Sequence, residues 1–163
     1  MSDQAKVEKI KFKIEVYSTY WNKPPVLKLQ LNDKSFYNDT VKSGIKDPTM
    51  IQFEASLKEG EKYNLSLHRS NKDNKQCVVE NGNIVKDQLL HIKSIEIDEI
   101  DIGSLIYNGV YTPEYPEPWY SQQVAEGNTP EKSYKNVSAM GHNGTWTLAF
   151  ESPFYMWLLE NLY

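Results

Sequence analysis

The sequence is poor in the residues that cysteine-dependent and strongly basic sites require. Cys77 is the only cysteine, and a single thiol forms neither an internal disulfide nor a cysteine zinc cluster. Arg69 is the only arginine, and a net charge of −4 provides no clustered basic surface for phosphate backbones. We therefore expect no disulfide, no cysteine-bound zinc and no nucleic-acid partner.

Long hydrophobic runs are missing as well. No apolar stretch approaches the roughly 18 residues that span a bilayer, and residues 1–6 lack the apolar core of a secretory signal. These absences predict a chain that does not insert into membranes and is synthesised in the cytoplasm without a signal peptide. Aromatic residues are abundant instead, because Tyr, Trp and Phe make up 12% of the sequence.

Alternating apolar and polar residues run through much of the chain. The period-two segments are 10–16, 27–31, 51–57, 63–67 and 145–150, and this pattern is typical of strands with one buried face. The turn at 59–61 predicts that 51–57 and 63–67 form a hairpin. Isoleucines between 89 and 102 indicate two short strands, or one strand with a bulge at Asp98-Glu99.

Many short strands with little helix predict an all-β fold, an antiparallel two-sheet β-sandwich of jelly-roll-like form. We expect residues 1–163 to form a single domain. Its parts are a sandwich core at 6–105, an irregular extension rich in aromatic residues and proline at 106–143, and a final strand with a short C-terminal helix at 144–163. The predicted core contains Ile10, Phe12, Ile14, Leu29, Leu31, Phe53, Leu65, Leu67, Ile95, Ile97, Trp146 and Leu148.

Residues with catalytic spacing are scarce. No nucleophile, base and orienting group form a recognisable motif around the three histidines. A group of acids lies within the isoleucine-rich segment, and paired carboxylates are what glycoside hydrolysis needs. Their alternation with isoleucines nevertheless indicates a solvent-facing strand, so we expect no enzyme. The acids are Glu96, Asp98, Glu99 and Asp101.

Oxygen-bearing side chains make calcium the one cofactor to expect. Asn71 and Asp73 lie in a polar loop, and Asp87 follows the turn at 81–83. Calcium prefers carboxylate and amide oxygens of this kind. The alternating acids of an EF-hand are missing, and ordinary turn formation explains the same residues, so both interpretations stay open.

Two parts of the chain resemble known families. The strand 25–31 with Asn32-Asp33, the strands of 51–67, and the segment 87–97 resemble calcium-dependent carbohydrate-binding modules of the xylan-binding type. That resemblance implies a sandwich that binds carbohydrate, with Asp87 as a calcium ligand. The segments 111–119, 143–146 and 152–161 resemble uncharacterised proteins of large tailed phages of marine cyanobacteria, which implies a phage or virion setting.

The rings on predicted loops give the leading hypothesis. Flat aromatic faces beside a few polar groups suit sugar recognition, so we expect a non-catalytic binding module of a phage structural protein that recognises surface polysaccharide. The alternative is a virion assembly or decoration protein, with the rings buried against other virion proteins. A glycan-active enzyme ranks last. The predicted carbohydrate-binding residues are Trp21, Tyr111, Tyr115, Trp119 and Tyr120.

Overall fold

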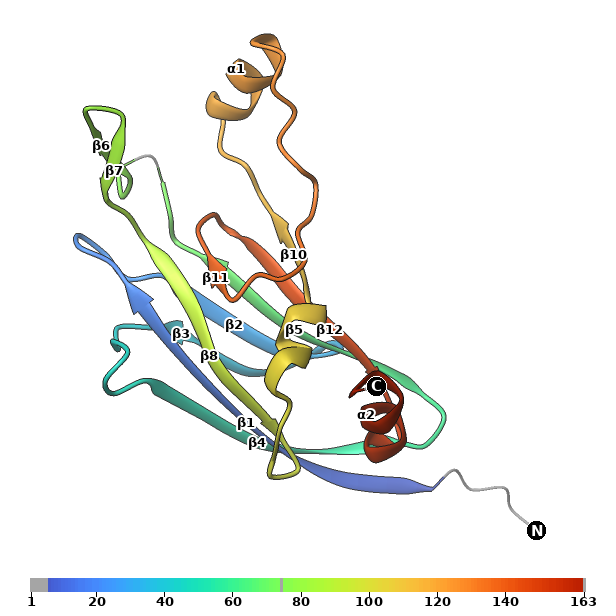
Figure 1. The fold of residues 1–163 in the computed structure, drawn as a ribbon. Helices are drawn as coiled ribbons and strands as arrows, with labels where there is room; N and C mark the ends of the chain where they lie inside the picture. The colour runs from blue at the N-terminus through green and yellow to red at the C-terminus, as the bar shows by residue number, and fades with distance from the viewer. Residues whose placement is uncertain (1–5, 74, 163) are drawn as a thin grey trace.

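The computed structural model describes residues 6–73 and 75–162, so the outer ends of the predicted domain, 1–5 and 163, lie outside the described residues. Two antiparallel sheets pack face to face (Figure 1), which confirms the all-β sandwich. One sheet has the order β11-β8-β1-β4, with β9 paired to β8. Its strands are β1 (Val7–Thr19), β4 (Thr49–Lys58), β8 (Leu89–Ile97), β9 (Ile100–Asp101) and β11 (Ala139–Met140).

The second sheet has the order β10-β12-β5-β2-β3. It contains β2 (Val26–Leu31), β3 (Lys34–Thr40), β5 (Lys62–Ser70), β10 (Val110–Pro113) and β12 (Gly144–Glu151). The remaining elements lie outside these sheets: the hairpin β6 (Val78–Glu80) and β7 (Asn83–Lys86), the 3-10 helix η1 (Gly103–Asn108), and the helices α1 (Trp119–Ala125) and α2 (Phe154–Leu162). None of the helices in the described ranges has the length and apolar character needed to cross a membrane.

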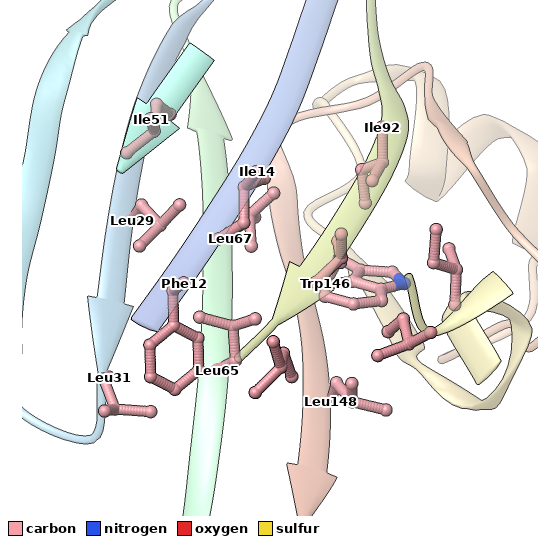
Figure 2. Packing of buried hydrophobic residues seen from close by; sticks show 14 of the residues in the cluster. Phe12, Ile14, Leu29, Leu31, Ile51, Leu65, Leu67, Ile92, Trp146 and Leu148 are labelled. Atoms are coloured by element: carbon pink, nitrogen blue, oxygen red, sulfur yellow. The ribbon is translucent and has the colours of Figure 1, made fainter. Parts of the chain in front are cut away.

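The core lies between the inner faces of the two sheets, as the alternation predicts. Eleven of the twelve predicted core residues are buried, and Phe53 is half-buried. Trp146 and Leu148 of β12 lie opposite Leu67 and Leu65 of β5 in the strand register (Figure 2). Each fully buried aliphatic or aromatic side chain contributes about 1.5–3 kcal/mol relative to an exposed one, so this layer is the main source of stability.

The predicted hairpin over 51–67 is wrong. β4 pairs with β1 in one sheet, whereas β5 pairs with β2 and β12 in the other. The turn at 59–61 therefore carries the chain from one sheet to the other. Alternation could not reveal this, because a strand with one buried face has the same pattern whether its neighbour pairs with it or faces it across the core.

The end of the isoleucine-rich segment forms a tight turn rather than a bulge. Asp98 and Glu99 both have positive φ and connect β8 to β9. The actual irregularity in β8 lies opposite Glu15 and Val16 of β1. The region 106–143, predicted as irregular, also contains the helix α1 and the strands β10 and β11.

The helix α2 packs on the body through Phe154 and Leu158, which are buried. Its first turn is bound to β1 by Glu8, whose Oε1 accepts hydrogen bonds from the Phe154 amide (2.8 Å) and the Ser152 hydroxyl (3.0 Å). A carboxylate at this end satisfies a helix amide that has no partner within the helix. The short C-terminal helix is therefore confirmed, with its N-terminal amide bound by a distant strand.

Candidate functional site

Three segments meet at one end of the sandwich, where α1 and the β6–β7 hairpin project (Figure 1). They are the loop that follows β5, the segment between β10 and α1, and the turn before β12. Together they enclose a cavity of about 210 Å³. Its lining residues are Lys72, Asp73, Cys77, Glu114, Pro116, Trp119, His142 and Asn143. We call this space the end cavity.

Aromatic rings gather beside the end cavity. Measured between ring centroids, Tyr115 lies 5.5 Å from Trp119, 5.7 Å from Tyr120 and, in a T-shaped contact, 5.3 Å from His142. The Tyr115 hydroxyl is also 2.9 Å from that of Tyr134. These contacts are typical of favourable aromatic pairs, so the cluster fixes the position of Trp119, which remains 36% exposed.

The structure brings together three of the five predicted rings and separates two. Tyr115, Trp119 and Tyr120 form the cluster just described. Tyr111 is only 4% exposed, because it lies in β10 rather than in a loop, and its hydroxyl accepts a hydrogen bond from the His142 amide. Its ring is therefore unavailable to a ligand, and the expectation of an exposed platform residue is wrong there.

Trp21 is exposed but belongs to a different contact group. Its indole Nε1 donates to the Gln76 carbonyl at 2.9 Å, and the Lys86 ammonium lies 4.6 Å from the ring centroid. A cation at this distance over an indole is attracted to its face. Trp21 therefore fastens the base of the β6–β7 hairpin instead of joining the Tyr115 cluster.

Several cavity residues carry no motif that singles them out in the sequence. His142 and Asn143 belong to a turn that looks merely structural, and Glu114 lies between prolines. The alternation of side chains in an extended segment could have identified Glu114 as a cavity residue. In an extended chain alternate residues face opposite sides, and here Glu114 and Pro116 line the end cavity while Pro113 and Tyr115 line a separate, shallower hollow.

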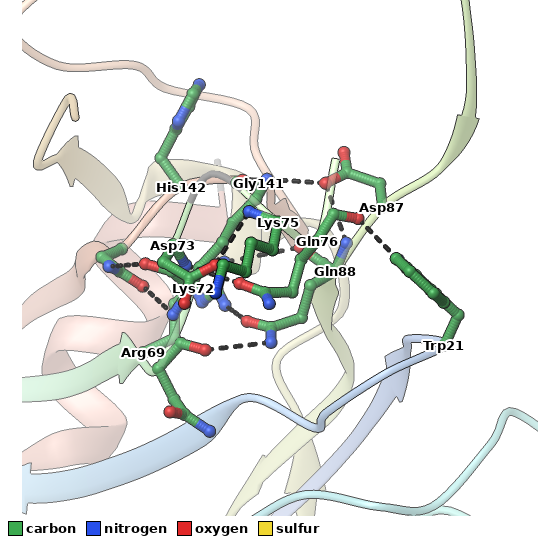
Figure 3. A network of polar contacts seen from close by, with 12 residues as sticks. Trp21, Arg69, Lys72, Asp73, Lys75, Gln76, Asp87, Gln88, Gly141 and His142 are labelled. Atoms are coloured by element: carbon green, nitrogen blue, oxygen red, sulfur yellow. Dashed lines mark hydrogen bonds and ion pairs between the residues drawn. The ribbon is translucent and has the colours of Figure 1, made fainter. Parts of the chain in front are cut away.

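Charged groups lie beneath the end cavity. Arg69 is fully buried, and its guanidinium donates to the side-chain and backbone oxygens of Gln88 (Figure 3). Burial lowers the pKa of Arg69 to about 10, an effect that Tyr111 and Asp87 oppose. Desolvation penalises any buried cation. Burial of His142 lowers the pKa of its ring, and Lys72 and Arg69 act in the same direction while Asp87 opposes them, so the neutral form of the ring is favoured.

The mouth of the end cavity presents carboxylates. The Asp73 side chain is half-exposed, and its pKa is lowered chiefly by the hydrogen bond from the Lys75 backbone amide. Glu114 is the more exposed of the two and lies 3.3 Å from His68 Nε2. Ionised carboxylates accept hydrogen bonds from hydroxyl donors. The cavity thus combines an aromatic wall with acceptors at its rim.

The residues predicted for calcium do not fit a calcium ion. The Asp87 carboxylate lies 2.6 Å from the Lys72 ammonium, and Asp73 lies 3.3 Å from that of Lys23. The Asn71 side chain donates its amide to the Pro24 carbonyl. Across residues 6–73 and 75–162, no group of three or more His, Cys, Asp or Glu is arranged to hold a metal. A calcium ion would have to displace ammonium groups from both carboxylates.

The acids that suggested glycoside hydrolysis are divided between different contacts. Glu96 lies 3.9 Å from the Lys13 ammonium, Asp98 accepts from the Tyr155 hydroxyl, and Asp101 accepts from the Gly103 amide. Glu96 and Glu99 line one surface hollow, whereas Asp101 lines another. Glu54 also lines the hollow of Glu96 and Glu99, so carboxylates do share one hollow, and Glu96 is the member paired with a lysine.

No protein-family profile and no curated protein matches this sequence. Two solved structures resemble the fold. One, described with calcium-dependent carbohydrate-binding modules related by circular permutation, is vCBM60, with a TM-score of 0.48 and 12% identity over 85% of this chain and 88% of that chain. The other is vCBM60 in complex with galactobiose, with a TM-score of 0.47 and 10% identity over 84% and 95%. At these values the likeness carries no argument about ligand or metal.

Proposed function

We propose that the end cavity binds carbohydrate without transforming it. The observation that carries this proposal is the placement of Trp119, whose half-exposed ring forms one wall of a cavity rimmed by Asp73 and Glu114. A sugar ring has apolar C–H faces and outward hydroxyls. It therefore packs on an aromatic face while its hydroxyls donate to planar polar groups.

The dimensions of the end cavity favour a small part of a polysaccharide. Its volume of about 210 Å³ lies below the range of roughly 300–1,000 Å³ that encloses drug-sized ligands. One sugar residue would therefore enter, and the rest of the chain would lie outside. The neighbouring hollow, lined by Tyr115, Tyr120 and Lys132 among others, offers further aromatic surface for adjoining residues.

The proposed setting is a virion, and the proposed ligand is a polysaccharide of a cell surface. The setting rests on the resemblance of 111–119, 143–146 and 152–161 to tailed-phage proteins. Two of these three segments border the end cavity or supply its residues. Retention of the purified chain on intact bacterial cells, and its loss after enzymatic removal of surface glycan, tests this part of the proposal.

A glycan array with Trp119→Ala tests the binding site. We expect the wild type to bind a subset of glycans and Trp119→Ala to lose that binding, with little change in melting temperature, because a half-exposed ring adds little to the core. Asp73→Asn and Glu114→Gln should weaken binding less. Tyr107→Ala, which removes an exposed ring elsewhere on the surface, is the matched control. Unchanged binding by Trp119→Ala would refute the proposed site.

An assembly role remains the second candidate, on a different surface from the one expected. The exposed side of α2 carries Tyr155, Met156 and Leu159, and apolar side chains of this kind are enriched at the centre of protein interfaces. Met156→Glu combined with Leu159→Glu should then reduce oligomer size in light scattering. If the wild type is monomeric at all concentrations tested, self-assembly through α2 is excluded.

A further inference from the structure

We infer that Lys72 is a built-in cation that organises the end cavity in the position where a metal ion was expected. Lys72 follows β5, and its ammonium lies 2.6 Å from Asp87 Oδ1 and 2.5 Å from the Gly141 carbonyl oxygen (Figure 3). A carboxylate and a backbone carbonyl are ligands that also suit a hard cation. Here an ammonium group occupies that position.

The contacts of Lys72 join three segments that are distant in sequence. Its side chain connects the loop after β5 to the start of β8 and to the turn before β12. Its backbone is held by the same turn, because the Lys72 amide donates to Asn143 Oδ1 at 3.1 Å and Asn143 Nδ2 donates to the Lys72 carbonyl at 2.9 Å. Lys72, Asn143 and His142 all line the end cavity, so this junction sets part of its shape.

Burial strengthens the contact between Lys72 and Asp87. The side chains of Lys72 and Asp87 are 12% and 19% exposed. An ion pair this far from water is weakly screened, and removal of one partner leaves an uncompensated charge. The pair of Lys23 with Asp73 at 3.3 Å is longer and lies between more exposed side chains, 34% and 53%, so it fixes the chain less strongly.

The charge balance also opposes a divalent ion. Asp87 is the carboxylate whose field acts on Arg69, and it is already paired with Lys72. Two largely buried cations therefore share one nearby carboxylate. A calcium ion would add two further positive charges beside Arg69 and Lys72, and like charges in a poorly solvated site repel strongly. We therefore expect binding at the end cavity to be independent of calcium.

Lys72 acts here as a positioning residue. Its expected effect on carbohydrate affinity rests on the proposed function. Its effect on the cavity can be measured without any sugar. Lys72→Met keeps the length and apolar stem of the side chain and removes its charge. Lys75→Met is the matched control, because Lys75 lies in the same loop with an exposed side chain and, among the described residues, hydrogen-bonds through its backbone amide alone.

The experiment records three properties of wild type, Lys72→Met and Lys75→Met: melting temperature in millimolar calcium and in chelator, the NMR signal of the Trp119 indole N–H, and glycan affinity. We expect calcium to leave the wild-type melting temperature unchanged.

Lys72→Met should shift the Trp119 signal while leaving that of the core residue Trp146 in place, and should weaken glycan binding about tenfold or more. Lys75→Met should match the wild type. Lys72→Arg, which keeps the charge, should restore part of the affinity.

A calcium-dependent rise in the wild-type melting temperature would overturn the inference, because a ligand that binds only the native state stabilises it. An unshifted Trp119 signal in Lys72→Met would overturn it too. Both of these outcomes can be distinguished from a failure of the proposed carbohydrate binding. If the wild type binds no glycan, the carbohydrate proposal fails, while the calcium melts and the Trp119 signal still decide the role of Lys72.

Discussion

The space between the sheets and the end cavity are built from different interactions. The core consists of apolar side chains from alternating strand positions, and their burial is its main source of stability. The end cavity is held by an ion pair, by hydrogen bonds between distant loops, and by contacts among rings. Burial is non-directional and tolerates small changes in shape, whereas the cavity depends on particular partners. Stability should therefore reside in the first region and recognition in the second.

Two tryptophans give the sharpest test of this division. Trp146 is fully buried, and its indole Nε1 has no hydrogen-bond partner in the described part of the chain, so it acts through packing. Trp146→Ala should lower the free energy of unfolding by about 3–5 kcal/mol, measured by urea denaturation. Trp119→Ala should lower it by about 0.5 kcal/mol or less.

Trp146→Phe is the control for the core substitution. It keeps an aromatic ring and removes the unpaired N–H, so it should cost much less than Trp146→Ala. If Trp119→Ala proved as destabilising as Trp146→Ala, the cavity end would be part of the core, and the division between stability and recognition would fail.

The ion pair beneath the cavity should give the next largest effect. Asp87→Asn removes the carboxylate that faces Lys72 and Arg69. Breaking a fully buried pair costs about 3–5 kcal/mol, and the partial exposure of this pair places the expected loss near the lower limit, at about 3 kcal/mol. Thermal melts across a range of salt concentrations measure it. A loss that vanishes at high salt would mark the pair as an ordinary surface contact.

The contrast between the two regions also explains what the sequence could predict. Period-two alternation identified eleven buried core residues, because a one-sided strand needs only the right residue type at each second position. It could not tell whether 51–57 and 63–67 pair or face each other. Strand β3 escaped notice because Phe36 and Tyr37 are adjacent and do not alternate.

The cavity was predicted only in part, for a related reason. Local composition identified Tyr115, Trp119 and Tyr120 as loop rings, but the burial of Tyr111 depends on the pairing of β10 with β12. The contacts of Lys72 with Asp87 and Gly141 join positions separated by 15 and 69 residues. No local pattern encodes such pairs. Oxygen-bearing residues near Asp87 therefore suggested a metal, while the lysine that pairs with Asp87 gave no signal.

Loss of the Glu8 contact with α2 should lower the free energy of unfolding by less than the two preceding changes. Glu8→Ala removes the acceptor for the Phe154 amide and the Ser152 hydroxyl. Loss of a helix-terminal acceptor costs about 0.5–2 kcal/mol, so we expect about 1 kcal/mol in urea denaturation. Glu151→Ala, at an exposed strand end, is the control. Faster amide exchange confined to α2 would locate the effect, and equal losses in both variants would contradict it.

Mild acid should produce the smallest effect and confine it to the cavity end. The folded-state pKa of His142 lies below its usual 6.5, first because of burial and then because of Lys72. The unfolded chain therefore takes up this proton at a higher pH than the folded one, so the associated stability is complete above about pH 6.5 and is lost as the pH falls through the folded pKa. Protonation would place a third cation beside Lys72 and Arg69. The protection of the 141–143 amides against exchange, taken relative to the intrinsic exchange rate at each pH, should thus fall between pH 7 and pH 5, before that of the core strand β12. His142→Gln should remove most of this loss of protection, and His91, whose pKa is also lowered by burial, should account for what remains. A loss of protection that starts in β12 would show that the two regions do not respond separately.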